Sequence, residues 1–149
     1  MRYTILFSIF LFAVVMVGCK KDKVGSKPTL KFKSVSTKIL PPHSLIQFTL
    51  SFTDAEGDLN DTMFVQKIEP SCELSNFTQN YIIPTFPVSK NEKGDLIVTF
   101  GNNPTDIAYF NIAAQCSRND TAVFRFAVKD KANHVSDTIS SPPIIIIYQ

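Results

Sequence analysis

The sequence predicts an all-β domain, a β-sandwich of about seven to nine short strands. Three observations favour this fold class. No stretch after the N-terminal segment keeps a helical period, short runs of alternating apolar and polar residues dominate, and turn residues separate these runs at spacings of roughly 8–12 residues. A small β-barrel is the alternative architecture that the same pattern allows.

The clearest strand is expected at 45–52, where Ile46, Phe48, Leu50 and Phe52 fall on one face and polar residues fall on the other. The segment 81–88 contains two prolines, which donate no backbone hydrogen bond, so we expect it at a sheet edge or a bulge. The full series of expected strands is 30–36, 45–52, 63–68, 81–88, 96–100, 109–116, 122–129, 136–140 and 144–148, with turns expected at 91–94, 101–104 and 130–134.

The N-terminal residues have the order of a secretory signal. Arg2 supplies positive charge, residues 5–17 form an apolar run broken only by Ser8, and Gly18 precedes Cys19. The apolar run is shorter than the roughly 20 residues that a membrane-spanning helix needs, which disfavours a signal anchor. An ordinary secretory signal with a chance cysteine is the alternative interpretation.

The sequence Met16-Val17-Gly18-Cys19 resembles the lipobox of bacterial lipoproteins, with methionine where leucine is usual. The resemblance implies cleavage after Gly18, acylation of Cys19 and anchoring of the mature chain in the bacterial cell envelope. The outer membrane is the expected location, with the periplasmic or surface side left open. We therefore expect a signal peptide at 1–18, a lipidated cysteine and flexible tether at 19–28, and one domain at 29–149.

The composition carries no electrostatic signature of a nucleic-acid partner. The chain has 149 residues, with 15 Lys and Arg against 13 Asp and Glu, and a net charge of +2. Two cysteines remain once Cys19 is acylated. An oxidising envelope lets Cys72 and Cys116 form a disulfide, and two separate buried thiols are the alternative.

A dense acidic segment, TDAEGDLNDT at 53–62, follows the clearest strand. Its carboxylates at Asp54, Glu56, Asp58 and Asp61 can converge oxygens on a hard cation such as Ca²⁺. An EF-hand is excluded, because the sixth and twelfth positions of such a loop would be leucine and valine here in place of glycine and glutamate. The other interpretation is a solvated turn in which Asp54 caps backbone groups. Calcium is the one cofactor that the sequence raises.

Two segments resemble a known group of domains. FTDAEGDL at 52–59 resembles the FTDxEGDL signature of immunoglobulin-like or cadherin-like domains in Bacteroidetes lipoproteins, and FAVKDKANHVS at 126–136 resembles their closing DxxGNxS segment, with Ala132 in place of the usual glycine. The resemblance implies an immunoglobulin-like sandwich and an envelope location. Comparable acidic motifs of cadherin-like domains bind calcium, and Asp130 and Asn133 would join such a site if the strand ends meet.

No catalytic arrangement is recognisable in the sequence, so we do not expect an enzyme. His43 and His134 are the only histidines, neither has metal-ligand spacing, and there is no G-x-S-x-G or phosphate-binding glycine motif. We expect a non-catalytic domain for adhesion or protein interaction. The alternative is a glycan-binding accessory lipoprotein of a nutrient-uptake system, with Tyr81 and Tyr109 as candidate stacking residues.

Three Asp-Thr-apolar sequences place Thr62, Thr121 and Thr138 in a pattern that resembles the O-glycosylation acceptor of Bacteroidetes envelope proteins. The pattern is short, and threonines that start strands are the other interpretation. The sequence thus predicts these three residues as candidate glycosylation sites.

Overall fold

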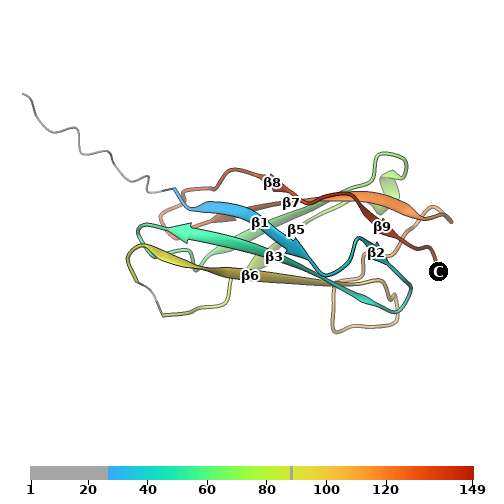
Figure 1. Ribbon diagram of the computed structural model, residues 1–149, viewed down its shortest axis with the longest axis horizontal. Coiled ribbons are helices and arrows are strands. Elements are labelled where there is room, and N and C mark those ends of the chain that lie inside the picture. Colours follow the sequence, from blue (N-terminus) through green and yellow to red (C-terminus); the bar gives the residue numbers. More distant parts are fainter. Residues whose placement is uncertain (1–26, 88) are drawn as a thin grey trace, which may run out of the picture.

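The computed structural model describes residues 27–87 and 89–149, so the predicted signal peptide and Cys19 lie outside the described residues. The strands are β1 (Thr29–Val35), β2 (Ile39–Leu40), β3 (Leu45–Asp54), β4 (Thr62–Ile68), β5 (Phe77–Ile82), β6 (Glu92–Gly101), β7 (Asp120–Lys129), β8 (Ile139–Ser140) and β9 (Ile144–Ile146), and η1 (Glu73–Ser75) is a short 3₁₀ turn. They form two sheets that pack face to face (Figure 1). The predicted β-sandwich is confirmed.

The strand order is that of an immunoglobulin-like sandwich. One sheet has the order β1-β3-β6, which corresponds to strands A, B and E, and the other has the order β2-β9-β7-β4-β5, which contains G, F and C with one strand added beyond C. A constant-type domain has a fourth strand, D, beyond E. Within the described part of this chain the smaller sheet ends at β6, and residues 83–87 and 89–91 lead from β5 to β6 without forming a strand.

Alternate side chains of the facing strands form the core. All four apolar residues predicted on one face of β3 are buried. The ring of Phe48 lies 4.8 Å from that of Phe124 and 5.3 Å from that of Phe126, so aromatic side chains of both sheets meet. Burying each such side chain stabilises the fold by roughly 1.5–3 kcal/mol. Within residues 27–87 and 89–149, the core cluster runs from Leu30 to Ile146.

The expected strand at 81–88 was only partly right. Pairing of β5 with β4 stops at Ile82, and β5 instead extends back to Phe77. Pro84 and Pro87 follow and cannot donate to a ladder, which explains why the strand ends there.

The expected strand at 109–116 was wrong. Only Asn111 makes a bridge, in parallel with Gly101. The side chains of Asp106 and Asn111 accept hydrogen bonds from the N–H groups of Ala108 (2.8 Å) and Ala113 (3.1 Å). Such local bonds compete with strand pairing, which alternating hydrophobicity does not reveal.

The expected turn at 91–94 belongs mostly to β6, which begins at Glu92. Gly94 serves close packing there, because a Cβ atom at this position would lie 2.8 Å from the ring of Phe52. The sequence analysis also missed the two-residue strand β2, which is too short for a periodic signal. The strand expected at 136–140 is shorter than predicted, because only β8 at Ile139–Ser140 pairs within it.

The predicted disulfide between Cys72 and Cys116 is present, with Cα atoms 6.0 Å apart and a sequence separation of 44. It joins the segment after β4 to the segment before β7. A crosslink that closes a loop of this length stabilises a domain by roughly 3–4 kcal/mol in the chain-entropy account.

A buried ion pair joins Lys67 and Asp120, two residues that lie a few positions outside the disulfide-linked cysteines in the sequence. Lys67 Nζ lies 2.7 Å from Asp120 Oδ2 and donates to the carbonyl oxygen of Ile112 at 3.0 Å. Burial lowers the pKa of Lys67, and the carboxylate of Asp120 opposes that shift. The pair joins β4, β7 and the 102–119 loop, and nothing in the sequence pattern pointed to it.

Candidate functional site

The acidic segment forms a tight turn at the end of β3. The buried Asp54 carboxylate accepts the N–H groups of Glu56 (3.2 Å) and Asp58 (2.7 Å). Gly57 has φ of 73°, and a Cβ atom there would lie 2.1 Å from the carbonyl oxygen of Ser89. Both oxygens of Asp54 are therefore engaged in shaping the turn, as the structural interpretation of the loop expects.

Asp61 points to a different partner. Its Oδ2 lies 3.0 Å from Lys129 Nζ, and its Oδ1 accepts a hydrogen bond from the hydroxyl of Thr62 at 2.9 Å. The hydrogen bond from Lys129, followed by that from Thr62, holds the pKa of Asp61 below its ordinary value. The four predicted calcium ligands are thus not gathered around one point.

Asp58 connects the acidic loop to the closing turn. Its carbonyl oxygen accepts the N–H of Lys131 at 3.0 Å, and its Oδ2 accepts the N–H of Ala132 at 3.2 Å. Burial raises the pKa of Asp58, and the negative charges of Asp130 and Asp54 raise it further. Oδ1 of Asp58 is buried and has no hydrogen-bond partner among the described residues. The carboxyl groups of Asp54, Asp58 and Asp130 therefore lie close enough to interact at this end of the sandwich.

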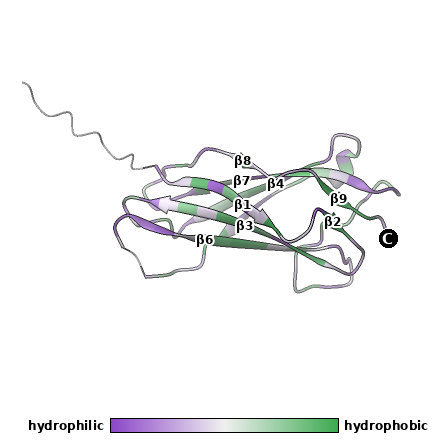
Figure 2. Ribbon diagram, in the orientation of Figure 1, coloured by the Kyte–Doolittle hydropathy of each residue, from purple (hydrophilic) through white to green (hydrophobic). Residues whose placement is uncertain are grey.

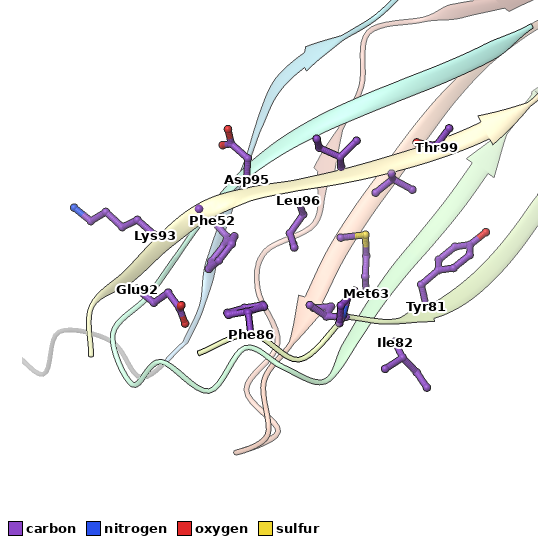
Figure 3. Close-up of a pocket in the computed structure, with 15 residues that line it drawn as sticks. Phe52, Met63, Tyr81, Ile82, Phe86, Glu92, Lys93, Asp95, Leu96 and Thr99 are labelled. Carbon is purple, nitrogen blue, oxygen red and sulfur yellow. The ribbon is translucent and has the colours of Figure 1, made fainter. Parts of the chain in front are cut away.

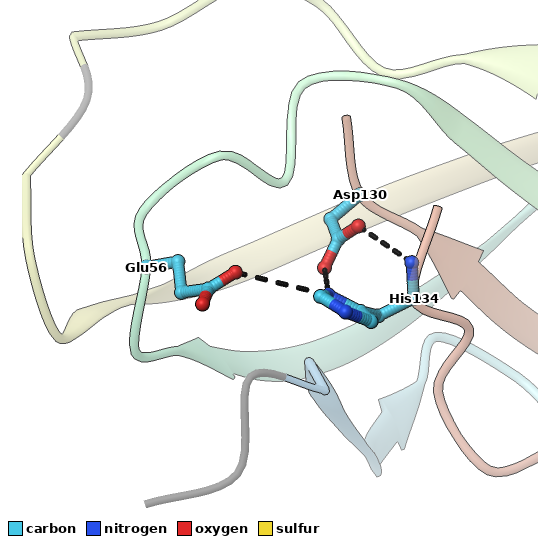
Figure 4. A group of neighbouring side chains, drawn as sticks. All are labelled: Glu56, Asp130 and His134. Atoms are coloured by element: carbon cyan, nitrogen blue, oxygen red, sulfur yellow. Dashed lines mark hydrogen bonds and ion pairs between the residues drawn. The ribbon is translucent and has the colours of Figure 1, made fainter. Parts of the chain in front are cut away.

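Glu56, Asp130 and His134 form a side-chain cluster at the same end (Figure 4). His134 Nδ1 lies 3.1 Å from Asp130 Oδ2 and 3.7 Å from Glu56 Oε2, and one ligand atom from each residue falls within 4.8 Å of the others. The expectation that Asp130 approaches the acidic loop is met. Asn133 takes a left-handed turn conformation with φ of 68°. The sequence analysis missed His134, because its partner Glu56 belongs to a segment far away in the chain.

The candidate glycosylation threonines differ in exposure. Thr121 and Thr138 are exposed, while Thr62 is partly buried and its hydroxyl is bonded to Asp61. Glycosylation of all three residues stays a prediction.

An elongated cleft of about 640 Å³ lies between β6 on one side and β5 with residues 83–86 on the other. Its walls are mainly apolar, with Phe52, Met63, Phe86 and Leu96 among them. Figure 3 shows Glu92 and Lys93 at one end of the cleft and Tyr81 and Ile82 at the other. The cleft lies where a fourth strand of the smaller sheet would stand.

The backbone of β6 is unpaired along the mouth of this cleft. The Gly101 N–H donates to the carbonyl oxygen of Phe110 at 3.1 Å, and the Ile112 N–H donates to that of Gly101 at 2.9 Å, so both backbone groups of Gly101 face away from β3. In an antiparallel pair, successive residues direct their N–H and C=O groups alternately toward and away from the partner strand. The backbone groups of residues 93, 95, 97 and 99 therefore point away from β3, as those of Gly101 do. Within the described chain, no strand lies beyond them.

The comparisons with known proteins identify no family. No protein-family model matches the chain, and no curated protein matches it either. Matches among the solved structures include a sporulation control protein, Spo0M, from Bacillus subtilis (8% identity, TM-score 0.45, 85% of this chain and 51% of that one) and a Niemann-Pick type C2 protein from the Japanese carpenter ant (12% identity, TM-score 0.43, 83% and 96%). The chain spans about half the length of the first. Neither likeness is strong enough to bear on function.

No helix in the described part of the chain is long and apolar enough to span a membrane. The apolar run at 5–17 lies outside the described residues.

Proposed function

We propose that this chain is a lipid-anchored, non-catalytic protein of the bacterial cell envelope whose immunoglobulin-like sandwich binds a partner protein. The anchor rests on the lipobox-like residues that end at Cys19. The proposed relation to Bacteroidetes lipoproteins rests on the resemblance of the segments 52–59 and 126–136. Support for treating these segments as one motif comes from the hydrogen bonds between Asp58 and residues 131 and 132.

An anchor at Cys19 gives the domain a direction relative to the membrane. Thr29, the first residue of β1, pairs with Thr53 beside the acidic loop, so the chain enters the sandwich at its acidic end. The C-terminus and the loop at 102–110 lie at the opposite end (Figure 1). In an anchored domain the acidic end therefore lies nearest the tether, and the exposed Ile107 and Tyr109 lie at the end farthest from it.

The open edge of β6 is the observation that carries the interaction hypothesis. An extended segment of a partner can add to such an edge through main-chain hydrogen bonds. Natural sheets usually protect a long edge with charges, and here Lys93 and Asp95 charge only the first half. The second half is hydrophobic in Figure 2, and the Ile97 side chain is 64% exposed. An edge of this kind is suited to pairing with another chain.

Site-specific photocrosslinking in the native host tests the proposal. We expect a photoreactive residue at position 97 to give a discrete adduct with one envelope protein. The same residue at position 49, across the sheet on β3, should give none, because both edges of β3 are paired. If no adduct forms from positions 93, 95, 97 or 99, the partner does not bind at this edge.

Substitution of Ile97 separates backbone pairing from side-chain contact. Ile97→Pro removes an N–H that the β3–β6 ladder does not use, so the sandwich stays folded while a paired partner is lost. Ile97→Ala keeps the N–H, and we expect it to retain the adduct from position 99. Equal loss in both variants would assign the contact to the isoleucine side chain and refute strand addition.

The anchor has a separate test. Labelling with an alkyne-bearing palmitate should mark the wild-type chain and transfer it to the membrane fraction, and Cys19→Ser should abolish both. A Cys19→Ser variant that still carries the label would refute acylation at this residue.

Glycan binding remains the second hypothesis from the sequence. Tyr81 lines the cleft, whereas Tyr109 lies beside Gly101 and is not among the cleft residues. The two tyrosines do not share one groove, so we give preference to the protein partner.

A further inference from the structure

The cleft between β5 and β6 has the size and lining of a small-molecule site. Its volume of about 640 Å³ lies within the range of roughly 300–1,000 Å³ that is typical of ligand pockets. The wall combines inward side chains of β6, such as Leu96 and Val98, with Met63 of β4 and Ile83 beyond β5. A cavity with these walls favours an apolar guest.

The cleft is a consequence of the fold. In a sandwich with a strand beyond β6, inward side chains of that strand would fill the space between the two sheet edges. Here Phe86 supplies part of that filling by packing against Phe52, with ring centroids 6.0 Å apart. The remaining length of the cleft runs toward Tyr81 and Ile82 (Figure 3).

Two polar atoms among the cleft residues lack partners. The Tyr81 hydroxyl and Glu92 Oε2 are both buried and have no hydrogen-bond partner among the described residues. Buried polar groups are nearly always paired in folded proteins. Both atoms are closed to solvent here, so a guest in the cleft can pair with either one only after its side chain turns toward the cleft. Figure 3 shows the Glu92 carboxylate directed toward Phe86, inside the cleft mouth.

We propose that this cleft binds a small amphipathic molecule, with an apolar body between β5 and β6 and a hydroxyl or amine that donates to Glu92. The Tyr81 hydroxyl serves as a second polar contact at the far end. This ligand is distinct from the partner protein proposed above, because it uses the inward side chains of β6, whereas strand addition uses the outward backbone groups of residues 93, 95, 97 and 99.

Fluorescence titration with N-phenyl-1-naphthylamine tests the proposal, because this probe combines an apolar aromatic body with one N–H donor. The titration uses residues 27–149, which contain the core cluster of the described chain from Leu30 to Ile146. We expect saturable binding with one site per chain. Leu96→Trp fills the cleft and should weaken binding at least about tenfold. Thr49→Trp, on the β3 residue paired with Ile97, is the matched control and should leave the affinity unchanged.

A second variant guards against loss of folding. Tyr81→Phe removes a hydroxyl that has no partner in the free protein, so the unliganded domain should unfold at the same or a higher temperature. Probe binding should nevertheless weaken by about two- to tenfold, the worth of one hydrogen bond. If Tyr81 had only a structural role, the substitution would lower the unfolding temperature and the probe affinity together. Weaker binding without a loss of stability therefore indicates contact with the probe.

The outcomes are decisive. Absence of saturable binding, or equal affinity of wild type and Leu96→Trp, overturns the proposal. Ile97→Pro should leave the probe affinity unchanged, even where it abolishes the crosslinked partner. If Ile97→Pro weakens probe binding as much as Leu96→Trp does, the cleft belongs to strand addition and the small-molecule site is refuted. A failed partner crosslink with intact probe binding leaves this proposal standing and overturns only the earlier one.

Discussion

Replacing Lys67 with methionine tests whether a buried ion pair holds the 102–119 loop against the sandwich. The side chains of Lys67 and Asp120 are 1% and 0% exposed, and their charged atoms are 2.7 Å apart. Lys67 Nζ also donates to the carbonyl oxygen of Ile112, inside that loop. The substitution therefore leaves one buried carboxylate without its counter-charge and one loop carbonyl without its donor.

Removing one partner of a buried ion pair costs about 3–5 kcal/mol, because the other charge stays buried and uncompensated. For a domain of this size each kcal/mol lowers Tm by roughly 3–5 °C, so we expect Tm of Lys67→Met to fall by about 10–20 °C. The double variant Lys67→Met, Asp120→Asn removes the stranded charge as well. The double variant should regain about half or more of the stability that Lys67→Met loses.

Thermal and urea unfolding of residues 27–149 measure these values. Gln66→Met, on the opposite face of the same strand, is the control, and we expect it to change stability by less than about 0.5 kcal/mol. A loss below about 1 kcal/mol for Lys67→Met would refute the argument. A double variant as unstable as the sum of the two single variants would do the same, because it would show that the charges do not interact.

Removing the disulfide by Cys72→Ser with Cys116→Ser should cost roughly 3–4 kcal/mol, and a reductant should lower wild-type Tm equally; a reductant-insensitive Tm would contradict it. Gly57→Ala should cost about 1–3 kcal/mol, since its φ is 73° and the new Cβ meets Ser89. The raised pKa of Asp58 means that its favourable contribution is complete below pH 3.8 and is lost as pH rises through the folded pKa. Asp58→Asn should therefore be more stable than wild type near about pH 7 and not at low pH. If the acidic loop binds calcium, as the sequence analysis raised, millimolar calcium should stabilise wild type and reverse that order. No reversal would leave the loop as a turn.

Several features could be predicted because their causes are local in the sequence. The period-two pattern of β3 places its apolar side chains on one face whatever the strand pairs with. The turn after β3 is equally local, because the Asp54 side chain accepts N–H groups two and four residues later. The same locality misled the expectation for 109–116, where side-chain bonds of Asp106 and Asn111 replace strand pairing.

The sequence by itself determined the β class, the approximate strands and the turn chemistry of the acidic loop, since all three depend on residues a few positions apart. Only the tertiary structure decided which distant groups meet. Lys67 finds Asp120 across 53 residues, and Asp58 meets Ala132 across 74. The cleft beyond β6 was likewise invisible in the sequence, because it exists where a strand is missing from a sheet, and strand order is set by packing between distant segments rather than by any local pattern.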